Sequence, residues 1–168
     1  MKKKFGFVVA AAFTCIVSAA AALYANADLS GEWTLNNSKS ELGEWGERIA
    51  PKKLTISGDA SAISVSRTVM SPEGAESPLT EKMTFDGKQT ESVMFGNTKK
   101  KASAKWSDDG KTMNVDAVIL LDNNGEQVEI KVKEAWSLGA DGKTLLLNST
   151  SNSQWGESTM KLVYDKTK

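Results

Sequence analysis

Apolar and polar residues alternate along most of the chain from residue 28 onward, which is the pattern of strands that bury one face. In that part of the sequence no stretch keeps a helical period for three turns. Dipeptides typical of tight hairpin turns separate the alternating segments, at Asp86-Gly87, Asp109-Gly110, Asn124-Gly125 and Asp141-Gly142. The pattern therefore predicts an all-β domain of about 8–10 antiparallel strands, each joined to the next by a short turn.

A two-residue turn fixes which residues face one another, so the predicted pairing can be compared with the apolar pattern. The turns from residue 109 onward place apolar residues opposite each other, including the pairs Trp106–Met113, Ala102–Ala117, Ile119–Ile130 and Trp136–Leu147. The last segment presents Met160, Leu162 and Tyr164 to the same side. Because an up-and-down meander with one apolar face satisfies its edges best by closing, we expect residues 28–168 to form a barrel.

The turn at Asp86-Gly87 fits this scheme less simply. A strict two-residue loop would point Thr90 and Ser92 inward, although Val93 and Phe95 are the apolar residues of that segment. A one-residue bulge after the glycine would reverse the two faces. We therefore expect a bulge there, with Val93 and Phe95 inside.

Charged residues fall on the apolar face of two neighbouring segments. Arg67 takes an inward position in "AISVSRTVM", and Glu81 does so in the next segment. A connection centred on Gly74 would place Arg67 opposite Glu81, and it would also make the pairs Val69–Leu79, Val65–Met83 and Ile63–Phe85. Because removing one partner of a buried ion pair costs roughly 3–5 kcal/mol, we expect the two charges to pair. Glu134 also faces inward, opposite Ser149.

Two interpretations of this interior follow. In the first, the barrel holds a ligand cavity in which Arg67 engages a carboxylate or a similar anionic head group. The inward charges would then form the polar part of the cavity, and its apolar part would be lined by Trp33, Trp106, Trp136, Met113 and Met160. In the second, the barrel is filled, the ion pair is structural and the tryptophans are core. Barrels of about eight strands can be filled by side chains, whereas wider barrels leave room.

Two further tryptophans, Trp45 and Trp155, lie in polar, glycine-containing segments outside the paired apolar lattice. Large aromatic side chains in such loops are candidates for a binding rim. Each could equally fold down as a plug over one end of the barrel.

The first 27 residues have the pattern of a secretion signal, because three lysines precede an apolar run that ends at "ANA". We expect cleavage before Asp28 and a periplasmic or secreted protein. A retained membrane anchor is the alternative. Cys15 is the one cysteine, and the residues before it are poor for lipoprotein processing, so we expect no lipid and no disulfide.

Charge and composition exclude several function classes. The whole chain has 21 basic and 21 acidic residues, and loss of the signal makes the remainder slightly acidic, so we expect no nucleic-acid partner. The lysine run Lys99–Lys101, with Lys105, is typical of a solvated hairpin edge. Because the sequence has no histidine, the commonest general base and metal ligand is absent. We expect no enzyme activity, no metal and no cofactor.

The stretch "LSGEWTLN" carries Gly31-x-Trp33, which resembles the glycine-x-tryptophan at the first strand of lipocalins and related small barrels. With "NNSKSELG" and the later "DGKT" hairpins, the chain is similar to secreted bacterial lipocalin-like proteins of the calycin type. Lipocalins also have an arginine on the last strand that packs on this tryptophan, and the chain departs from that pattern, since Lys161 and Lys166 are the nearest basic residues.

Together these patterns predict a secreted barrel that binds a small apolar or amphipathic molecule. The alternative is an interaction or inhibitor module that has a filled core and recognises a protein through its loops.

Overall fold

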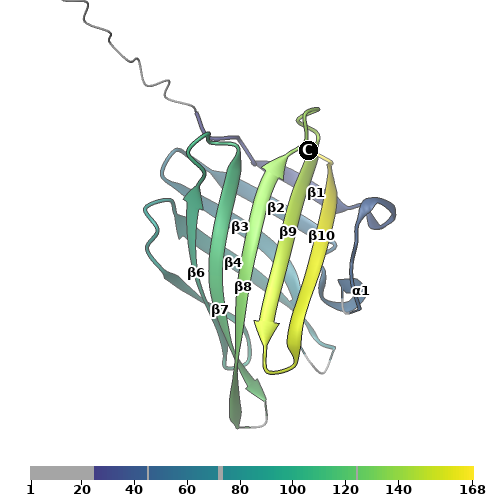
Figure 1. Cartoon of the computed structure of the whole chain (residues 1–168), viewed down its shortest axis with the longest axis vertical. Coiled ribbons are helices and arrows are strands. Elements are labelled where there is room, and N and C mark those ends of the chain that lie inside the picture. Colours follow the sequence, from purple (N-terminus) through teal and green to yellow (C-terminus); the bar gives the residue numbers. More distant parts are fainter. Residues whose placement is uncertain (1–24, 45, 72–73, 124) are drawn as a thin grey trace, which may run out of the picture.

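The computed structural model describes residues 25–44, 46–71, 74–123 and 125–168. Most of the predicted signal segment, together with Cys15, Trp45 and Asn124, lies outside the described residues. Ten strands form one antiparallel sheet that curves into a nearly closed barrel (Figure 1). They are β1 (Gly31–Leu35), β2 (Lys53–Gly58), β3 (Ala62–Met70), β4 (Glu76–Thr84), β5 (Thr90–Phe95), β6 (Thr98–Trp106), β7 (Thr112–Asn123), β8 (Glu126–Leu138), β9 (Thr144–Ser153) and β10 (Gly156–Lys166).

The strands follow an up-and-down order in which chain neighbours, apart from β4 and β5, are also sheet neighbours. The first strand β1 pairs with the last strand β10, so the two ends of the chain are joined within the sheet. The sheet order begins at β4 and ends at β5, and among the described residues no backbone ladder connects these two strands. A 3-10 turn, η1 (Asn37–Lys39), and a short helix, α1 (Gly46–Ile49), link β1 to β2. The described ranges contain no helix long and apolar enough to cross a membrane.

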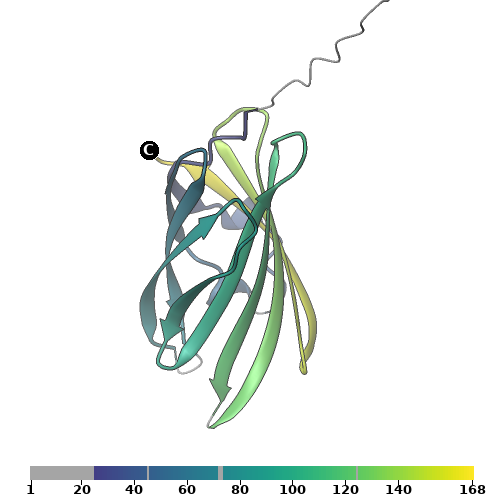
Figure 2. The same ribbon diagram turned by 90° about the vertical axis from the view of Figure 1, so that its left-hand side faces the viewer.

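Residues 25–30 and the C-terminus lie at one end of the barrel, which we call the closed end, as Figures 1 and 2 show. The turns that join β7 to β8 and β9 to β10 lie at the opposite end, which we call the open end (Figure 1). The Ala27 N–H donates to the Gly110 carbonyl at 2.8 Å, and Leu29 is buried. The N-terminal segment therefore covers the closed end.

The predicted register is confirmed from β6 to β10. Trp106 pairs with Met113 and Ala102 with Ala117 between β6 and β7. The remaining predicted pairs, Ile119–Ile130 and Trp136–Leu147, are also present. On β10, Met160, Leu162 and Tyr164 face Ser149, Leu147 and Leu145 of β9. Tight turns between strictly alternating strands explain this success, because each turn leaves one register that buries the apolar face.

The predicted β3–β4 register is wrong by two residues. Arg67 lies opposite Leu79, and Val65 lies opposite Glu81. The reason is the turn, whose closing pair is Met70 with Glu76, so that it is centred one residue before Gly74. A two-residue shift returns each side chain to the same face. The inward residues of β3 and β4 are therefore still inward, and Arg67 and Glu81 become diagonal neighbours.

The expected bulge after Gly87 is also wrong. Val93 is 57% exposed, and the register of β5 against β6 shifts between Val93 and Phe95 instead. The irregularity turns Phe95 inward and leaves Val93 outside. Ser92 lies opposite the buried Lys100, so it shares the inner face. Ser92 can therefore face inward beside the polar Lys100, whereas Val93 was expected on the inner face.

Large side chains fill the closed end. Trp33, Trp136 and Tyr164 are each at most 1% exposed, and the Trp33 Nε1–H donates to the Leu29 carbonyl at 3.0 Å. Lys166 pairs with Trp33 in the sheet, and its Nζ lies 5.1 Å from the Trp33 ring centroid. The lysine Lys166 therefore lies against Trp33 on the last strand, where the lipocalin pattern has an arginine.

Candidate functional site

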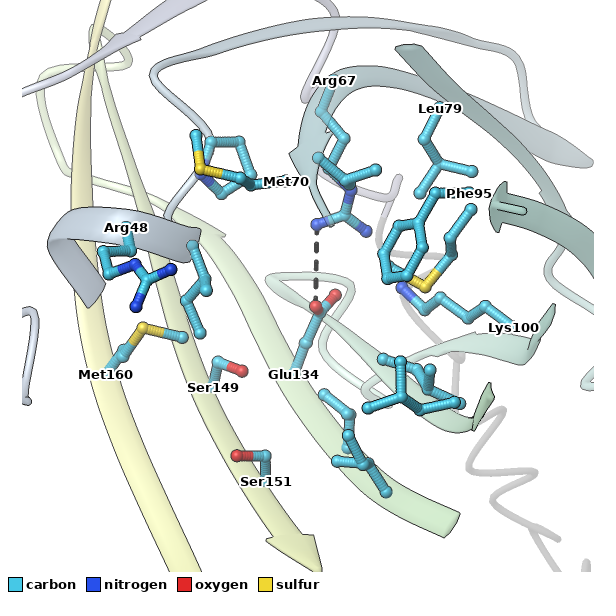
Figure 3. A pocket seen from close by; sticks show the side chains of 18 of the residues that line it. Arg48, Arg67, Met70, Leu79, Phe95, Lys100, Glu134, Ser149, Ser151 and Met160 are labelled. Atoms are coloured by element: carbon cyan, nitrogen blue, oxygen red, sulfur yellow. Dashed lines mark ion pairs between the residues drawn. The ribbon is translucent and has the colours of Figure 1, made fainter. Parts of the chain in front are cut away.

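A cavity of about 520 Å³ occupies the barrel toward the open end (Figure 3). It reaches Ser71 in the β3–β4 turn and Trp155 in the β9–β10 turn, so it extends to the turns of that end. Its walls are mostly aliphatic, sulfur-containing and aromatic, and include Val69, Met70, Leu79, Met94, Phe95, Ile119, Leu121, Ile130, Val132, Leu147, Met160 and Leu162. Arg48 and Ile49 of α1 also line it. Protein sites for small molecules have cavities of roughly 300–1,000 Å³ with such walls.

Charged side chains line the inner part of this cavity or lie just behind it. Arg67, Lys100 and Glu134 line it, and Glu81 lies behind Arg67 and Lys100. Their side chains are between 2% and 8% exposed. Groups so far removed from water remain charged when they are paired. We call these four residues the interior charge cluster.

Glu81 is the shared counter-ion of the two cations. Its Oε2 accepts a hydrogen bond from Arg67 Nε at 3.0 Å and also contacts Arg67 Nη2. Its Oε1 lies 2.8 Å from Lys100 Nζ. The predicted pairing of Arg67 with Glu81 therefore occurs, although the two residues meet diagonally and with a third partner.

Lys100 is the residue that sequence reasoning missed. The lysine run was interpreted as a solvated edge, yet Lys100 is 4% exposed and points into the barrel. Its neighbours Lys99 and Lys101 point outward, where both pair with Glu91. The missed signal was the alternation of β6, because Thr98, Lys100, Ala102 and Ala104 all occupy inward positions.

Glu134 connects the cluster to the packed core of the closed end. Its Oε2 accepts a hydrogen bond from Trp136 Nε1 at 3.0 Å. Its Oε1 lies 3.7 Å from Arg67 Nη1, which is an ion pair beyond hydrogen-bond distance (Figure 3). The Arg67 guanidinium carbon also lies 5.9 Å from the Trp136 ring centroid. Trp136 therefore helps to orient both the Glu134 carboxylate and the Arg67 guanidinium from the side of the closed end.

The surroundings of Arg67 and Glu81 determine the charge states of these two residues. Burial raises the pKa of the Glu81 carboxyl, but the positive charges of Arg67 and Lys100 outweigh it, and the pKa falls from 4.5 to about 2. Burial lowers the pKa of the Arg67 guanidinium, but Glu81 and Glu134 outweigh it and leave that pKa above its ordinary value. Both groups are therefore ionised at neutral pH.

The structure separates the predicted site residues into two groups. Arg67, Glu134 and Met160 line the cavity, and so does Trp155, which is 61% exposed in its turn. Trp33, Met113 and Trp136 are at most 1% exposed and belong to the packed closed end, contrary to the expectation that they line the cavity. Trp106 lines a different hollow, beside residues 25–30, where it packs against Phe85 with ring centroids 5.6 Å apart. Glu81 lies behind Arg67 and Lys100. Trp45 lies outside the described residues. The inward face holds both groups, but only their depth along the barrel decides which ones meet the cavity.

This arrangement can hold an elongated apolar molecule by its body and a polar group by its end. The apolar walls would cover the body, and the Arg67 and Glu134 edges, with the hydroxyls of Ser149 and Ser151 nearby, offer hydrogen-bond donors and acceptors (Figure 3). A few convergent polar groups in an apolar cavity are typical of binding sites for small molecules.

No protein-family model matches the chain, and no curated protein matches it significantly. Among solved structures, zebrafish ileal bile acid-binding protein complexed with cholic acid is similar, with a TM-score of 0.52 and 16% identity over 82% of this chain and 98% of that chain. A luciferase domain from the dinoflagellate Lingulodinium polyedrum gives a TM-score of 0.49 and 8% identity over 82% of this chain and 42% of that chain. Together with the strand order, the first likeness shows that the fold is a calycin-like β-barrel.

Proposed function

We propose that this barrel binds one small apolar or amphipathic molecule in the cavity at its open end. The observation that carries the proposal is the cavity of about 520 Å³, with apolar walls and a charged inner part. The alternative prediction, an interaction module, assumed a filled barrel core. A cavity of this volume favours the ligand-binding function, and the fold shared with a bile acid-binding protein is consistent with it.

Binding rather than catalysis also fits the chemistry of the cavity. Its two buried cations, Arg67 and Lys100, both form ion pairs with Glu81. Glu81 and Glu134 hold the pKa of the Arg67 guanidinium above its ordinary value, so Arg67 can position a ligand but is a poor general base at neutral pH. We propose further that the protein acts outside the cytoplasm, because its first 27 residues have the pattern of a cleaved signal that would leave Asp28 at the N-terminus.

Two measurements test the binding function. Native mass spectrometry of protein purified from its own host should reveal a retained small molecule. In the delipidated protein, the neutral dye N-phenylnaphthylamine should become fluorescent on entering the cavity. Leu121→Trp, which fills the cavity near its mouth, should abolish the fluorescence gain.

Leu120→Trp is the matched control. Leu120 is the next residue of β7 and lies opposite the outward-facing Lys99, so its substitution leaves the cavity unchanged. Equal loss of dye binding in both variants, or binding that survives Leu121→Trp, would show that the dye does not occupy the cavity. Absence of dye binding together with absence of a retained molecule would refute the proposed function.

A further inference from the structure

We infer that the ligand's polar end is uncharged and carries a hydroxyl group that both donates and accepts hydrogen bonds. This inference rests on the proposed function, and it differs from the anionic head group that Arg67 alone would suggest. The reason is the charge balance of the interior cluster.

The residues that line the inner cavity give a misleading charge. Arg67, Lys100 and Glu134 together carry one net positive charge, which would favour an anion. Behind them Glu81 contacts both cations, with Arg67 Nε at 3.0 Å and Lys100 Nζ at 2.8 Å. The cluster as a whole is neutral, so an added anion or cation would leave one buried charge without a counter-ion.

The remaining charge at the cavity, Arg48, does not alter this balance. Arg48 belongs to α1, and its side chain lies apart from the Arg67 guanidinium, as Figure 3 shows. Its side chain is exposed. Water and salt therefore screen its charge far more than the charges of the buried cluster.

The geometry between Arg67 and Glu134 favours a hydroxyl. Arg67 Nη1 and Glu134 Oε1 lie 3.7 Å apart, too far for a direct hydrogen bond. One hydroxyl oxygen beside them can accept from the guanidinium and donate to the carboxylate. A ligand carboxylate in the same place would contact the Glu134 carboxylate, and a ligand ammonium would contact the Arg67 guanidinium, so each meets a like charge. Ser149, which lies opposite Glu134, and Ser151 beyond it can bind a second hydroxyl.

Displacement of N-phenylnaphthylamine by dodecanol, dodecanoate and dodecylammonium at neutral pH tests the inference, because the three competitors share one apolar chain. We expect dodecanol to bind at least roughly tenfold more tightly than either charged competitor. A tighter affinity for dodecanoate or dodecylammonium would overturn the inference while leaving the proposed function intact. Competition by none of the three, with the dye bound in the cavity, would overturn it as well.

Charge-changing variants supply the second test. Glu134→Gln keeps an acceptor for Trp136 Nε1 and gives the cluster one net positive charge, so dodecanoate should gain roughly tenfold in affinity. Glu129→Gln is the control, because it makes the same change at an exposed position of β8 and should leave all three affinities unchanged. Lys100→Met makes the opposite change and should favour dodecylammonium. An unchanged order of the three competitors in folded Glu134→Gln or Lys100→Met protein would overturn the inference.

Discussion

Glu81→Gln is the substitution that most directly tests how the interior charge cluster is held together. The change keeps the size of the side chain and removes the charge that both buried cations contact. Arg67 would retain Glu134 at 3.7 Å as its ion-pair partner, while Lys100 would lose the carboxylate 2.8 Å from its Nζ. The variant therefore leaves a cluster with one excess positive charge away from water.

The loss should be large because Glu81 serves two partners. Two unit charges about 4 Å apart interact by about 4 kcal/mol at an effective dielectric constant of 20. Measured losses on removing one partner of a buried pair are about 3–5 kcal/mol. We expect the unfolding free energy to fall by an amount at the upper end of that range. Lys100→Met should cost less, because Glu81 keeps its contacts to Arg67 Nε and Nη2.

A double-mutant cycle measured by urea denaturation isolates the coupling. The Glu81→Gln/Lys100→Met double variant restores a neutral cluster, so its loss should be smaller than the sum of the single losses by about 2 kcal/mol. A double variant that folds when Glu81→Gln alone does not would show the same coupling. The control is Lys99→Met, on the outer face of the same strand, where the pair with Glu91 is exposed and contributes at most about 1 kcal/mol.

The result that would refute this reasoning is additivity. If the single losses sum to that of the double variant within about 0.5 kcal/mol, Glu81 and Lys100 do not act as a pair. A loss for Lys99→Met as large as that for Lys100→Met would show that position on the strand, rather than burial inside the barrel, sets the effect.

Three further outcomes are expected. Because the pKa of Glu81 is lowered from 4.5 to about 2 on folding, its contribution of roughly 3 kcal/mol is complete above about pH 5 and should be lost as the pH falls toward 2, which urea titrations across that range would measure. Trp155→Ala should change the unfolding free energy by less than about 1 kcal/mol and weaken dye binding, whereas Trp33→Ala should cost about 3–5 kcal/mol, and equal losses would make Trp155 a structural plug. Intact-mass measurement on protein from its host should give a chain that starts at Asp28 without lipid, and a diacylglyceryl adduct would contradict this.

How far the fold could be predicted depended on the turns. The strands from β6 to β10 are joined by short turns within strictly alternating sequence, so one register buries the apolar residues. The β3–β4 connection spans residues 71–75, and its length alone allowed two registers that bury the same face. Hydrogen bonds within the turn select between these two registers, including the one from the Ser71 N–H to the Ala75 carbonyl at 2.9 Å. The pattern of apolar residues gives no information about such bonds.

The sequence predicted most of the charged residues of the candidate site, but it did not predict which inward residues line the cavity. Arg67, Glu81 and Glu134 stood out because each interrupts an apolar face. Lys100 did not, since two lysines flank it and a charged run is usually solvated. Depth along the barrel was also hidden, because strand alternation gives the face of a residue and not its height. Met160 lines the cavity, while Met113, on the same inner face, belongs to the packed end.

The position of the interior charge cluster explains how one barrel can be both filled and hollow. Toward the closed end the inward positions carry Trp33, Trp136 and Tyr164, which leave little space. Toward the open end the inward positions of β9 carry Ser149 and Ser151, which are too small to meet the opposite wall and leave the cavity between. The interior charge cluster lies at the boundary between the packed and the hollow parts. There Glu134 accepts a hydrogen bond from Trp136, and the guanidinium of Arg67 lies near the Trp136 ring. The packed closed end therefore holds these polar groups in place. Because they are already ordered in the folded protein, a ligand that bonds to them loses little further side-chain entropy.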